Sequence, residues 1–365
     1  GVFEGHDDGL VSIAIFPDGT KAVTCDEAGL ALVWNLTLIA SGEVSGSGSG
    51  PGFPDPVLFV VDDEISPAPA ILVAVSPDGS AVATAGDDGT TRLWHLQTGK
   101  LLQALTGHED DIRGLSIARD GTIVTTSEDA TAKVWGVVPF LTAPTRTTRL
   151  LDDIHCVAVS PDSKMFATGD EDYFANVWDL RTGKLLMSIQ GHDDWVNGIA
   201  FSPDGTRLVT ASDDYTAKVW DLTARAPSKY VLAHQFHESS YADFYEDVYS
   251  VATSPDGGRV ATGHEDGYIL VWDSMSGALV HMISGHDDDV NAVAITPDGT
   301  KLVTASDDET AKVWSMETGE LLGTFWGHDD DVLCVAISPD GTTAVTGDED
   351  DIAIVWNLTE VATGA

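Results

Sequence analysis

The chain has 365 residues and a formal net charge of −41, because 59 Asp and Glu outnumber 18 Lys and Arg. Hydrophobic residues make up 43% of it and aromatic residues 8%, which excludes a disordered acidic tail and provides enough apolar side chains for a core. A surface this negative repels polyanions, so the composition argues against nucleic acid and anionic membranes as partners.

The chain begins with a short apolar segment, Val2–Phe3, and then repeats one pattern eight times. Each repeat contains a Trp that ends a short apolar run, and successive Trp residues lie 60, 41, 43, 42, 52, 42 and 42 residues apart. A period near 42 is typical of an array of small sheets, in which each repeat is one supersecondary unit. The eight residues are Trp34, Trp94, Trp135, Trp178, Trp220, Trp272, Trp314 and Trp356.

Within a repeat, four short apolar runs alternate with turns. Residues 290–326, for example, predict strands at VNAVAI, KLVTAS, TAKVWS and LLGTFW. No window of helical length shows a 3.6-residue period, so the chain is predicted to be all-β. Because the runs are nearly continuously apolar, both faces of each small sheet should be buried against neighbouring sheets. Pro-Asp-Gly supplies the turn between the first two strands at 77–79, 203–205, 297–299 and 339–341.

Three irregular segments interrupt the repeats. Residues 41–56, SGEVSGSGSGPGFPDP, predict a flexible Gly/Ser/Pro insertion. Residues 136–150 form the one basic strip that the sequence suggests. Residues 229–249 are rich in aromatic side chains and predict an insertion on one face that binds a partner. Its candidate binding residues are Tyr241, Phe244 and Tyr245.

Four residue types recur at fixed places in the repeats: a Gly-His before the first strand, a Thr in the second strand, an Asp in the next turn, and the Trp. On these residues the chain resembles the WD40-repeat β-propeller family over essentially its full length. The resemblance implies one domain over residues 1–365, with eight four-stranded blades around a central channel.

The two ends of the sequence predict how this ring closes. The last repeat stops soon after IAIVWNLTE without a full fourth strand, whereas GVFEGH at the N-terminus resembles LLGTFWGH. We therefore expect Val2–Phe3 to complete the last blade and to close the ring, which removes exposed sheet edges. A seven-bladed ring with one aberrant unit is the alternative.

The resemblance also implies a buried, hydrogen-bonded tetrad of His, Thr, Asp and Trp that holds each blade together. Complete sets are His108, Thr125, Asp129 and Trp135; His192, Thr210, Asp214 and Trp220; His286, Thr304, Asp308 and Trp314; and His328, Thr346, Asp350 and Trp356. The first repeat has Ala28 where the Asp is expected, and the second and fourth lack the Gly-His. In the sixth repeat the nearest candidate, His234, would need a looped-out segment. The Asp positions of these three later repeats are Asp88, Asp172 and Asp266. We expect these four blades to be held less tightly.

Acidic residues fall at two sets of equivalent positions on the face that carries the Gly-His segments, which we call the top face. The residue seven before each Trp is acidic in all eight repeats: Glu27, Asp87, Glu128, Glu171, Asp213, Glu265, Asp307 and Glu349. The residue before the first strand is acidic in five: Asp111, Asp153, Asp247, Asp289 and Asp331. Trp195 takes this place in its own repeat and would expose an indole. Both sets should surround the channel mouth and focus a negative potential there.

These features predict a non-catalytic scaffold whose acidic top face and aromatic insertion bind a protein partner through a Lys/Arg-rich segment. Catalysis is not expected, because the His and Asp residues have structural roles and no nucleophile elbow or phosphate-binding loop occurs. No cofactor is predicted, although exposed carboxylates are ligands that Ca²⁺ prefers. The alternative is a cation-binding or salt-adapted structural protein, extracellular or at the cell surface. We expect a monomeric propeller, and the sequence leaves its compartment open.

Overall fold

The computed structural model describes residues 2–3, 6, 8–28, 30–36, 70–96, 98–136, 144–150, 152–223, 231–236, 247–350 and 352–359. These residues form 31 strands and one short 3-10 helix, η1 (Glu265–Gly267). They contain no helix with the length and hydrophobicity needed to cross a lipid bilayer. The predicted insertion at 41–56 and residues 237–246, which hold Tyr241, Phe244 and Tyr245, lie outside the described part of the chain.

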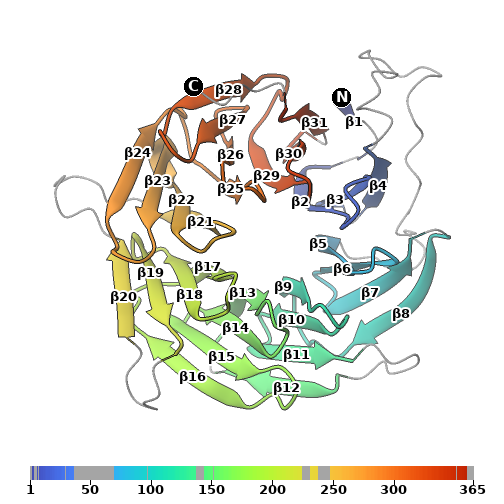
Figure 1. The fold of residues 1–365 in the computed structure, drawn as a ribbon. Coiled ribbons are helices and arrows are strands. Elements are labelled where there is room, and N and C mark those ends of the chain that lie inside the picture. The colour runs from blue at the N-terminus through green and yellow to red at the C-terminus, as the bar shows by residue number, and fades with distance from the viewer. Residues whose placement is uncertain are drawn as a thin grey trace.

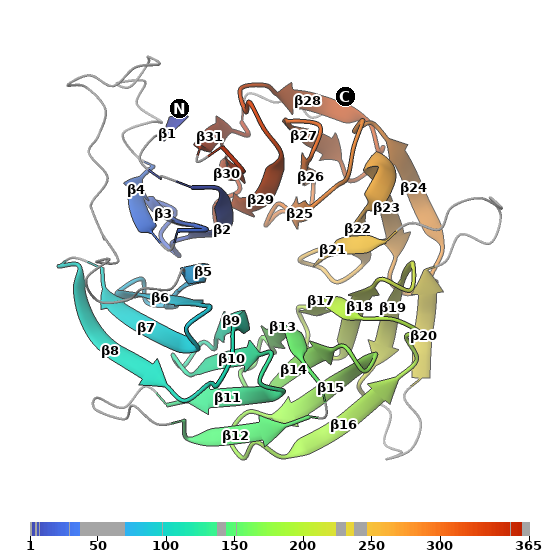
Figure 2. The same cartoon turned by 180° about the vertical axis from the view of Figure 1, so that it is seen from behind.

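The strands form eight antiparallel sheets arranged in a ring, which confirms an all-β propeller of eight blades rather than seven (Figures 1 and 2). Blade 1 contains β2 (Leu10–Ile15), β3 (Lys21–Asp26) and β4 (Ala31–Asn35), and blade 2 contains β5 (Ala70–Val75), β6 (Ala81–Gly86), β7 (Thr90–His95) and β8 (Lys100–Thr106). Blade 3 contains β9 (Ile112–Ile117), β10 (Ile123–Ser127), β11 (Thr131–Trp135) and β12 (Arg146–Arg149). Blade 4 contains β13 (Ile154–Val159), β14 (Met165–Asp170), β15 (Phe174–Asp179) and β16 (Leu185–Gln190).

Blades 5 to 8 follow in the same order. Blade 5 contains β17 (Val196–Phe201), β18 (Arg207–Ser212), β19 (Thr216–Asp221) and β20 (Val231–Phe236), and blade 6 contains β21 (Val248–Thr253), β22 (Arg259–His264), β23 (Tyr268–Asp273) and β24 (Leu279–Ser284). Blade 7 contains β25 (Ala292–Ile295), β26 (Lys301–Ser306), β27 (Thr310–Ser315) and β28 (Leu321–Phe325). Blade 8 contains β29 (Val332–Ile337), β30 (Thr343–Asp348), β31 (Ala353–Asn357) and β1 (Val2–Phe3).

The N-terminal strand closes the ring as the sequence predicts. β1 pairs antiparallel with β31, with Val2 opposite Ile354 and Phe3 opposite Ala353. Blade 8 is therefore built from segments near both ends of the sequence, and Figure 1 shows β1 beside β31. Around the channel, the first strand of each blade contacts the first strand of the next, including β2 and β29 across the closure.

The core lies between neighbouring blades. The second and third strands are buried along most of their length, as in β26 and β27. One apolar cluster joins Val209 and Val219 of blade 5 to Val260 and Trp272 of blade 6. Both faces of the inner strands are thus covered, as the continuous apolar runs predict.

The Pro-Asp-Gly turns lie at the opposite end from the top face, and their Asp residues are structural. The Asp298 side chain accepts hydrogen bonds from the Thr296 hydroxyl (2.6 Å) and from the Thr300 backbone N–H (3.0 Å). These bonds lower the pKa of Asp298. Gly299 follows with a φ of 73°, a conformation that glycine adopts without steric cost. Many acidic residues therefore serve turn geometry alone.

Candidate functional site

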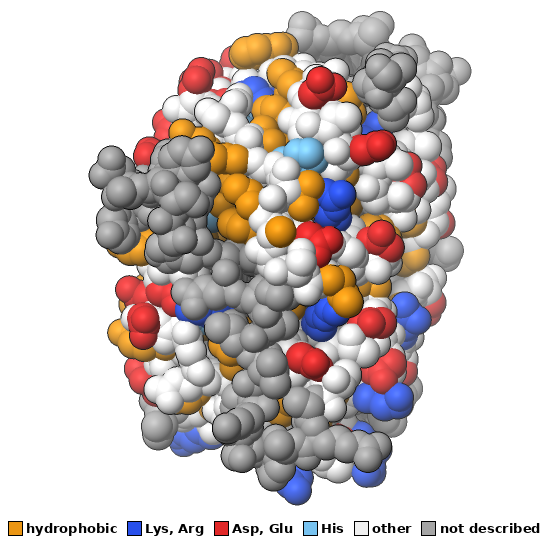
Figure 3. All heavy atoms as spheres, turned by 60° about the vertical axis from the view of Figure 1, so that its left-hand side comes forward, with side chains coloured by type: hydrophobic (Ala, Val, Ile, Leu, Met, Phe, Trp, Pro, Cys, Tyr) orange, Lys and Arg blue, Asp and Glu red, His pale blue; other side chains and the backbone are white. Residues whose placement is uncertain are grey.

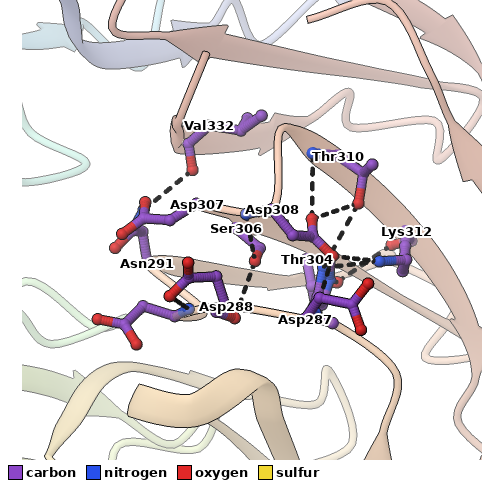
Figure 4. Close-up of polar contacts among 12 residues, drawn as sticks. Asp287, Asp288, Asn291, Thr304, Ser306, Asp307, Asp308, Thr310, Lys312 and Val332 are labelled. Carbon is purple, nitrogen blue, oxygen red and sulfur yellow. Dashed lines mark hydrogen bonds and ion pairs between the residues drawn. The ribbon is translucent and has the colours of Figure 1, made fainter. Parts of the chain in front are cut away.

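In blade 7, the second of two neighbouring Asp residues, Asp308, belongs to the tetrad, whereas the first, Asp307, does not (Figure 4). His286 donates through Nδ1 to Oδ2 of Asp308 at 2.8 Å, and its Nε2 lies 2.7 Å from Oγ1 of Thr304. Trp314 donates through Nε1 to the same hydroxyl at 3.0 Å. Lys312, whose side chain is 9% exposed, completes the group as the counterion of Asp308.

Hydrogen bonds and the lysine charge set the ionisation of Asp308. Burial alone would raise its pKa, but the hydrogen bonds from His286, Lys312 and Thr310 outweigh burial and lower it. Burial in turn lowers the pKa of His286, more than its contact with Asp308 raises it. The tetrad thus contains an ionised Asp paired with a buried Lys, with a neutral His between the Asp and the Thr.

Blades 3 and 5 repeat this arrangement, which confirms three of the four predicted sets. The Nδ1–Oδ2 distances are 2.9 Å for His108 and Asp129 and 2.8 Å for His192 and Asp214. The buried lysines are Lys133 and Lys218, which lie 2.9 and 2.7 Å from the same carboxylates. Sequence reasoning missed these lysines, although each occurs two residues before the Trp.

The fourth predicted set is wrong in one residue. His328 pairs with Asp348 at 2.6 Å, whereas Asp350 is exposed in the following turn. Both side chains of the His328–Asp348 pair are 0% exposed. The third-strand residue opposite Thr346 is Ile354, where blade 7 has Lys312 opposite Thr304. Blade 8 therefore has no lysine at this position to pair with a carboxylate from the turn, and Asp348 at the end of β30 supplies the carboxylate that bonds to His328.

Blade 1 uses the same solution, so the prediction that its tetrad is incomplete is also wrong. His6 bonds to Asp26 at 2.8 Å and to Thr24 at 2.6 Å, and Trp34 donates to Thr24 at 2.7 Å. Leu32 stands opposite Thr24, again in place of a lysine. Asp26 therefore does what Ala28 cannot do, from two residues earlier in the chain.

Blades 2 and 4 keep the Trp–Thr bond and vary the rest. Their Trp Nε1 to Thr Oγ1 distances are 3.0 and 3.1 Å. In blade 2, Asp88 pairs with Arg92 at 2.6 Å. In blade 4, Asp170 rather than the predicted Asp172 is the buried carboxylate, and it accepts from Asn176 Nδ2 at 2.9 Å. Because burial outweighs its hydrogen bonds, the pKa of Asp170 is raised to about 6.

Blade 6 takes its His from an unexpected place. His264, the last residue of β22, bonds through Nε2 to Thr262 at 2.7 Å. The candidate named from sequence, His234, pairs with Val219 inside blade 5 and is wrong. Asp266, where the sequence predicts the tetrad Asp, is exposed and has a φ of 61°. A His at a strand end carries no repeat signature, so the spacing could not reveal it.

On the top face, the structure brings the two predicted acidic sets together. In seven blades the backbone N–H of the residue seven before the Trp donates, at 2.8 to 3.1 Å, to a carbonyl just before the first strand, from the adjacent residue in six blades and three residues before β25 in blade 7. The pairs are Glu27 and Gly9, Glu128 and Asp111, Glu171 and Asp153, Asp213 and Trp195, Glu265 and Asp247, Asp307 and Asp289, and Glu349 and Asp331. We call these acidic residues, with Asp87 and Trp195, the rim. Each described rim side chain is exposed or half-buried.

The second residue of several first strands holds a rim carboxylate of its own blade. Arg113 bonds to Glu128 at 2.6 Å, His155 to Glu171 at 2.8 Å, and Asn197 to Asp213 at 2.5 Å. Asn291 donates in the same way to Asp307 (Figure 4). The sequence shows that these residues are equivalent, but it gives no sign that they position carboxylates.

Trp195 is exposed on the rim, as the sequence predicts. The residue is 42% accessible, and its ring stacks on His155 of the neighbouring blade at 5.4 Å between centroids. The stacking contact with His155 therefore holds the indole against blade 4. One part of its surface still faces solvent.

The rim is electrostatically crowded. Burial and neighbouring carboxylates raise the pKa of seven rim residues: Asp111, Asp153, Asp213, Asp247, Asp289, Asp307 and Asp331. The largest shift is at Asp247, where burial and then Asp213, Glu265, Asp194 and Asp289 raise the pKa to about 6. Among the described ion pairs, only Arg113 brings a Lys or Arg to these residues.

Three groups, each made of two rim residues and the Asp that precedes one of them, bring carboxylate oxygens within 4.8 Å of one another: Asp110, Asp111 and Glu128; Asp152, Asp153 and Glu171; and Asp330, Asp331 and Glu349. Oxygen ligands of this kind suit Ca²⁺. In the first two groups, however, Arg113 and His155 already engage the Glu. Exposed acidic groups commonly come this close without a bound ion.

Comparison with known proteins adds family information to this geometry. The family model described as "WD domain, G-beta repeat" matches residues 1–35, 72–95, 99–136, 146–179, 183–221, 238–273, 277–315 and 319–357. A computationally designed protein, Ika8, has the same fold with a TM-score of 0.76, 23% identity and 98% coverage of both chains.

Curated relatives are larger proteins. Periodic tryptophan protein 2 of Arabidopsis thaliana is 29% identical over 218 residues, which are 59% of this chain and 23% of the relative. Autophagy-related protein 16 of the same plant is 28% identical over 220 residues, which are 58% of this chain and 40% of the relative. The matched region thus spans less than half the length of these relatives.

Proposed function

Because the chain belongs to the WD40-repeat family, whose propellers typically act as non-catalytic scaffolds that bind other proteins, we propose that its rim binds a Lys/Arg-rich segment of a partner protein. The observation that carries this proposal is the mutual crowding of rim carboxylates, most marked at Asp247. A cationic side chain placed among them relieves like-charge repulsion and gains several attractive contacts at once.

The distribution of charge supports the same surface. Three described lysines and one arginine are used inside blades, as counterions of tetrad carboxylates. The rim therefore keeps its negative charge, with Arg113 as its one Lys or Arg partner in the described ion pairs. Trp195 adds an exposed aromatic ring on which a guanidinium or ammonium group can stack. In this proposal Tyr241, Phe244 and Tyr245 extend the binding surface beyond the described residues.

A matched pair of double variants tests the proposal. Glu265→Gln with Asp307→Asn removes two rim charges, whereas Glu317→Gln with Glu320→Gln removes two charges from the turn before β28, away from the rim. We expect the affinity for a fluorescent Lys/Arg-rich peptide to fall roughly three- to tenfold in the rim variant. Wild-type binding should weaken as NaCl rises. Equal losses in both variants would reduce the effect to net charge and would contradict a rim site.

The competing interpretation, a Ca²⁺-binding structural protein, makes a different prediction. A specific ligand of the folded state raises the melting temperature beyond any effect of ionic strength. If the rim serves a cationic polypeptide, melting temperatures in CaCl₂ and in NaCl of matched ionic strength should agree. A calcium-specific rise would instead assign the carboxylates to metal ligation.

A further inference from the structure

The outer side of blades 2, 3 and 4 has the opposite charge to the rest of the molecule. Its strands, β8, β12 and β16, are the outermost strands of their sheets. Residues 98–106, 145–150 and 180–190, which form these strands and parts of the adjoining turns, contain five basic residues and no Asp or Glu, in a chain of net charge −41. One carboxylate lies next to them: Asp179, at the end of β15, accepts a hydrogen bond from Thr182 in the turn before β16. We call this surface the outer strip. Its basic residues are Lys100, Arg146, Arg149, Arg181 and Lys184.

These five side chains are exposed, and none forms an ion pair with a carboxylate of the described residues. Blades 3 and 4 are continuous here, because a Cβ on Gly183 would lie 3.2 Å from the Cβ of Arg146. Figure 3 shows Lys and Arg side chains on the surface at its lower end, on the side of the ring where β12 and β16 lie.

Exposed leucines lie beside these charges, and a feature of the strands explains why. The pairing of β15 with β16 shifts register between Val177 and Trp178, so Leu186 is an extra residue on the outer strand. Such a bulge turns two successive side chains outward. Leu185 and Leu186 are consequently 40% and 46% exposed. Leu101 and Leu102 of β8 repeat the arrangement, at 37% and 53%.

Blade 7 shows that the fold does not require the basic charge. Residues 98–102 and 182–186 both read TGKLL, whereas the equivalent residues 318–322 read TGELL. β28 forms the same register shift with Glu320 in place of the lysine. Lys100 and Lys184 therefore give their blades a surface property rather than a structural one.

We propose that the outer strip binds an extended acidic peptide of a partner protein, which adds as a fifth strand along β16. Its carboxylates would meet Lys184, Arg146 and Arg181, and its apolar side chains would cover Leu185 and Leu186. An outermost strand offers backbone donors and acceptors for this kind of pairing. A short peptide brings few negative charges, whereas a nucleic acid would be repelled by the remainder of this anionic protein. This site is separate from the rim and does not depend on the function proposed for it.

Two charge-reversal variants with the same change in net charge test the inference. Lys184→Glu reproduces the blade 7 sequence in blade 4, where the peptide adds, and Lys164→Glu changes an exposed basic residue of the same blade outside the outer strip. The probe is a fluorescent peptide of roughly eight residues, one strand in length, that alternates Glu with Val or Leu. We expect about fivefold or greater loss of affinity in the first variant and less than about twofold in the second.

Hydrogen exchange on the same complex locates the peptide. Slower exchange confined to β16 and the turn before it would support strand addition. Three results would overturn the inference: equal losses in both variants, binding that persists when the Glu residues of the peptide become Gln, or tighter binding of a single-stranded oligonucleotide of similar length.

Discussion

Asp307 and Asp308 are adjacent in the sequence and have opposite roles. Asp308 points into blade 7, where hydrogen bonds and Lys312 lower its pKa despite burial. Asp307 faces the rim, where burial and neighbouring carboxylates raise its pKa, although Asn291 partly opposes the rise. The same side chain thus stabilises the fold in one place and leaves unrelieved repulsion a single residue away. Unrelieved repulsion of this kind is what a cationic partner can remove.

The largest difference between the two positions should appear in stability. Asp308→Asn leaves Lys312 buried without a counterion, which costs about 3–5 kcal/mol. Asp307→Asn should change the free energy of unfolding by less than about 0.5 kcal/mol. Urea unfolding of both variants checks this. Similar losses of unfolding free energy in the two variants would contradict the assignment of Asp308, and not Asp307, to the fold.

Blade 8 sharpens the comparison, because its sequence suggests the wrong residue. Asp348→Asn weakens a fully buried His–Asp bond and should cost about 2–3 kcal/mol. Asp350→Asn, in the exposed turn, should have almost no effect on unfolding by urea. The reverse order would restore Asp350 to the tetrad.

Blade 4 contains a buried carboxylate whose pKa is raised instead of lowered. The folded pKa of Asp170, about 6, lies above the unfolded value near 3.9. Its contribution to stability is therefore most favourable below pH 4 and is lost as the pH rises through 6. Asp170→Asn should stabilise the protein by about 1 kcal/mol at pH 8 and by little at pH 4. Unfolding midpoints across this range measure the difference, and a difference independent of pH would contradict the assignment.

A smaller effect is expected on the rim. Asp247 takes up a proton as the pH falls through about 6, so one attractive charge disappears. Affinity for the Lys/Arg-rich peptide should fall roughly threefold more between pH 7.5 and 5.5 in the wild type than in Asp247→Asn. Peptide titrations at the two pH values provide the test. Identical pH profiles would show that Asp247 does not contribute to binding.

The repeat alone predicts most of the fold. The eight Trp residues, the Pro-Asp-Gly turns and the match between GVFEGH and LLGTFWGH predict eight blades and their closure, because every repeat obeys the same local rules. The placement of the rim follows from the same register, since each acidic residue keeps its distance from the Trp.

Side-chain partners across strands are what the spacing could not predict. Asp26 and Asp348 replace the turn Asp because Leu32 and Ile354 occupy the position of a lysine. The residue that supplies the carboxylate on the second strand therefore depends on the residue across from it on the third strand. The stack of Trp195 on His155 joins two blades, and the outer strip joins three. Such contacts depend on distances between residues of different repeats, whereas the repeat pattern describes only positions within a single repeat.

One titration tests the division of roles between adjacent carboxylates most directly. The carboxyl ¹³C shifts of Asp307 and Asp308 would be followed while the Lys/Arg-rich peptide is added to the wild-type protein. The rim proposal predicts a saturable change at Asp307 and none at Asp308. A change at Asp308, or no change at either residue while the peptide binds, would contradict it.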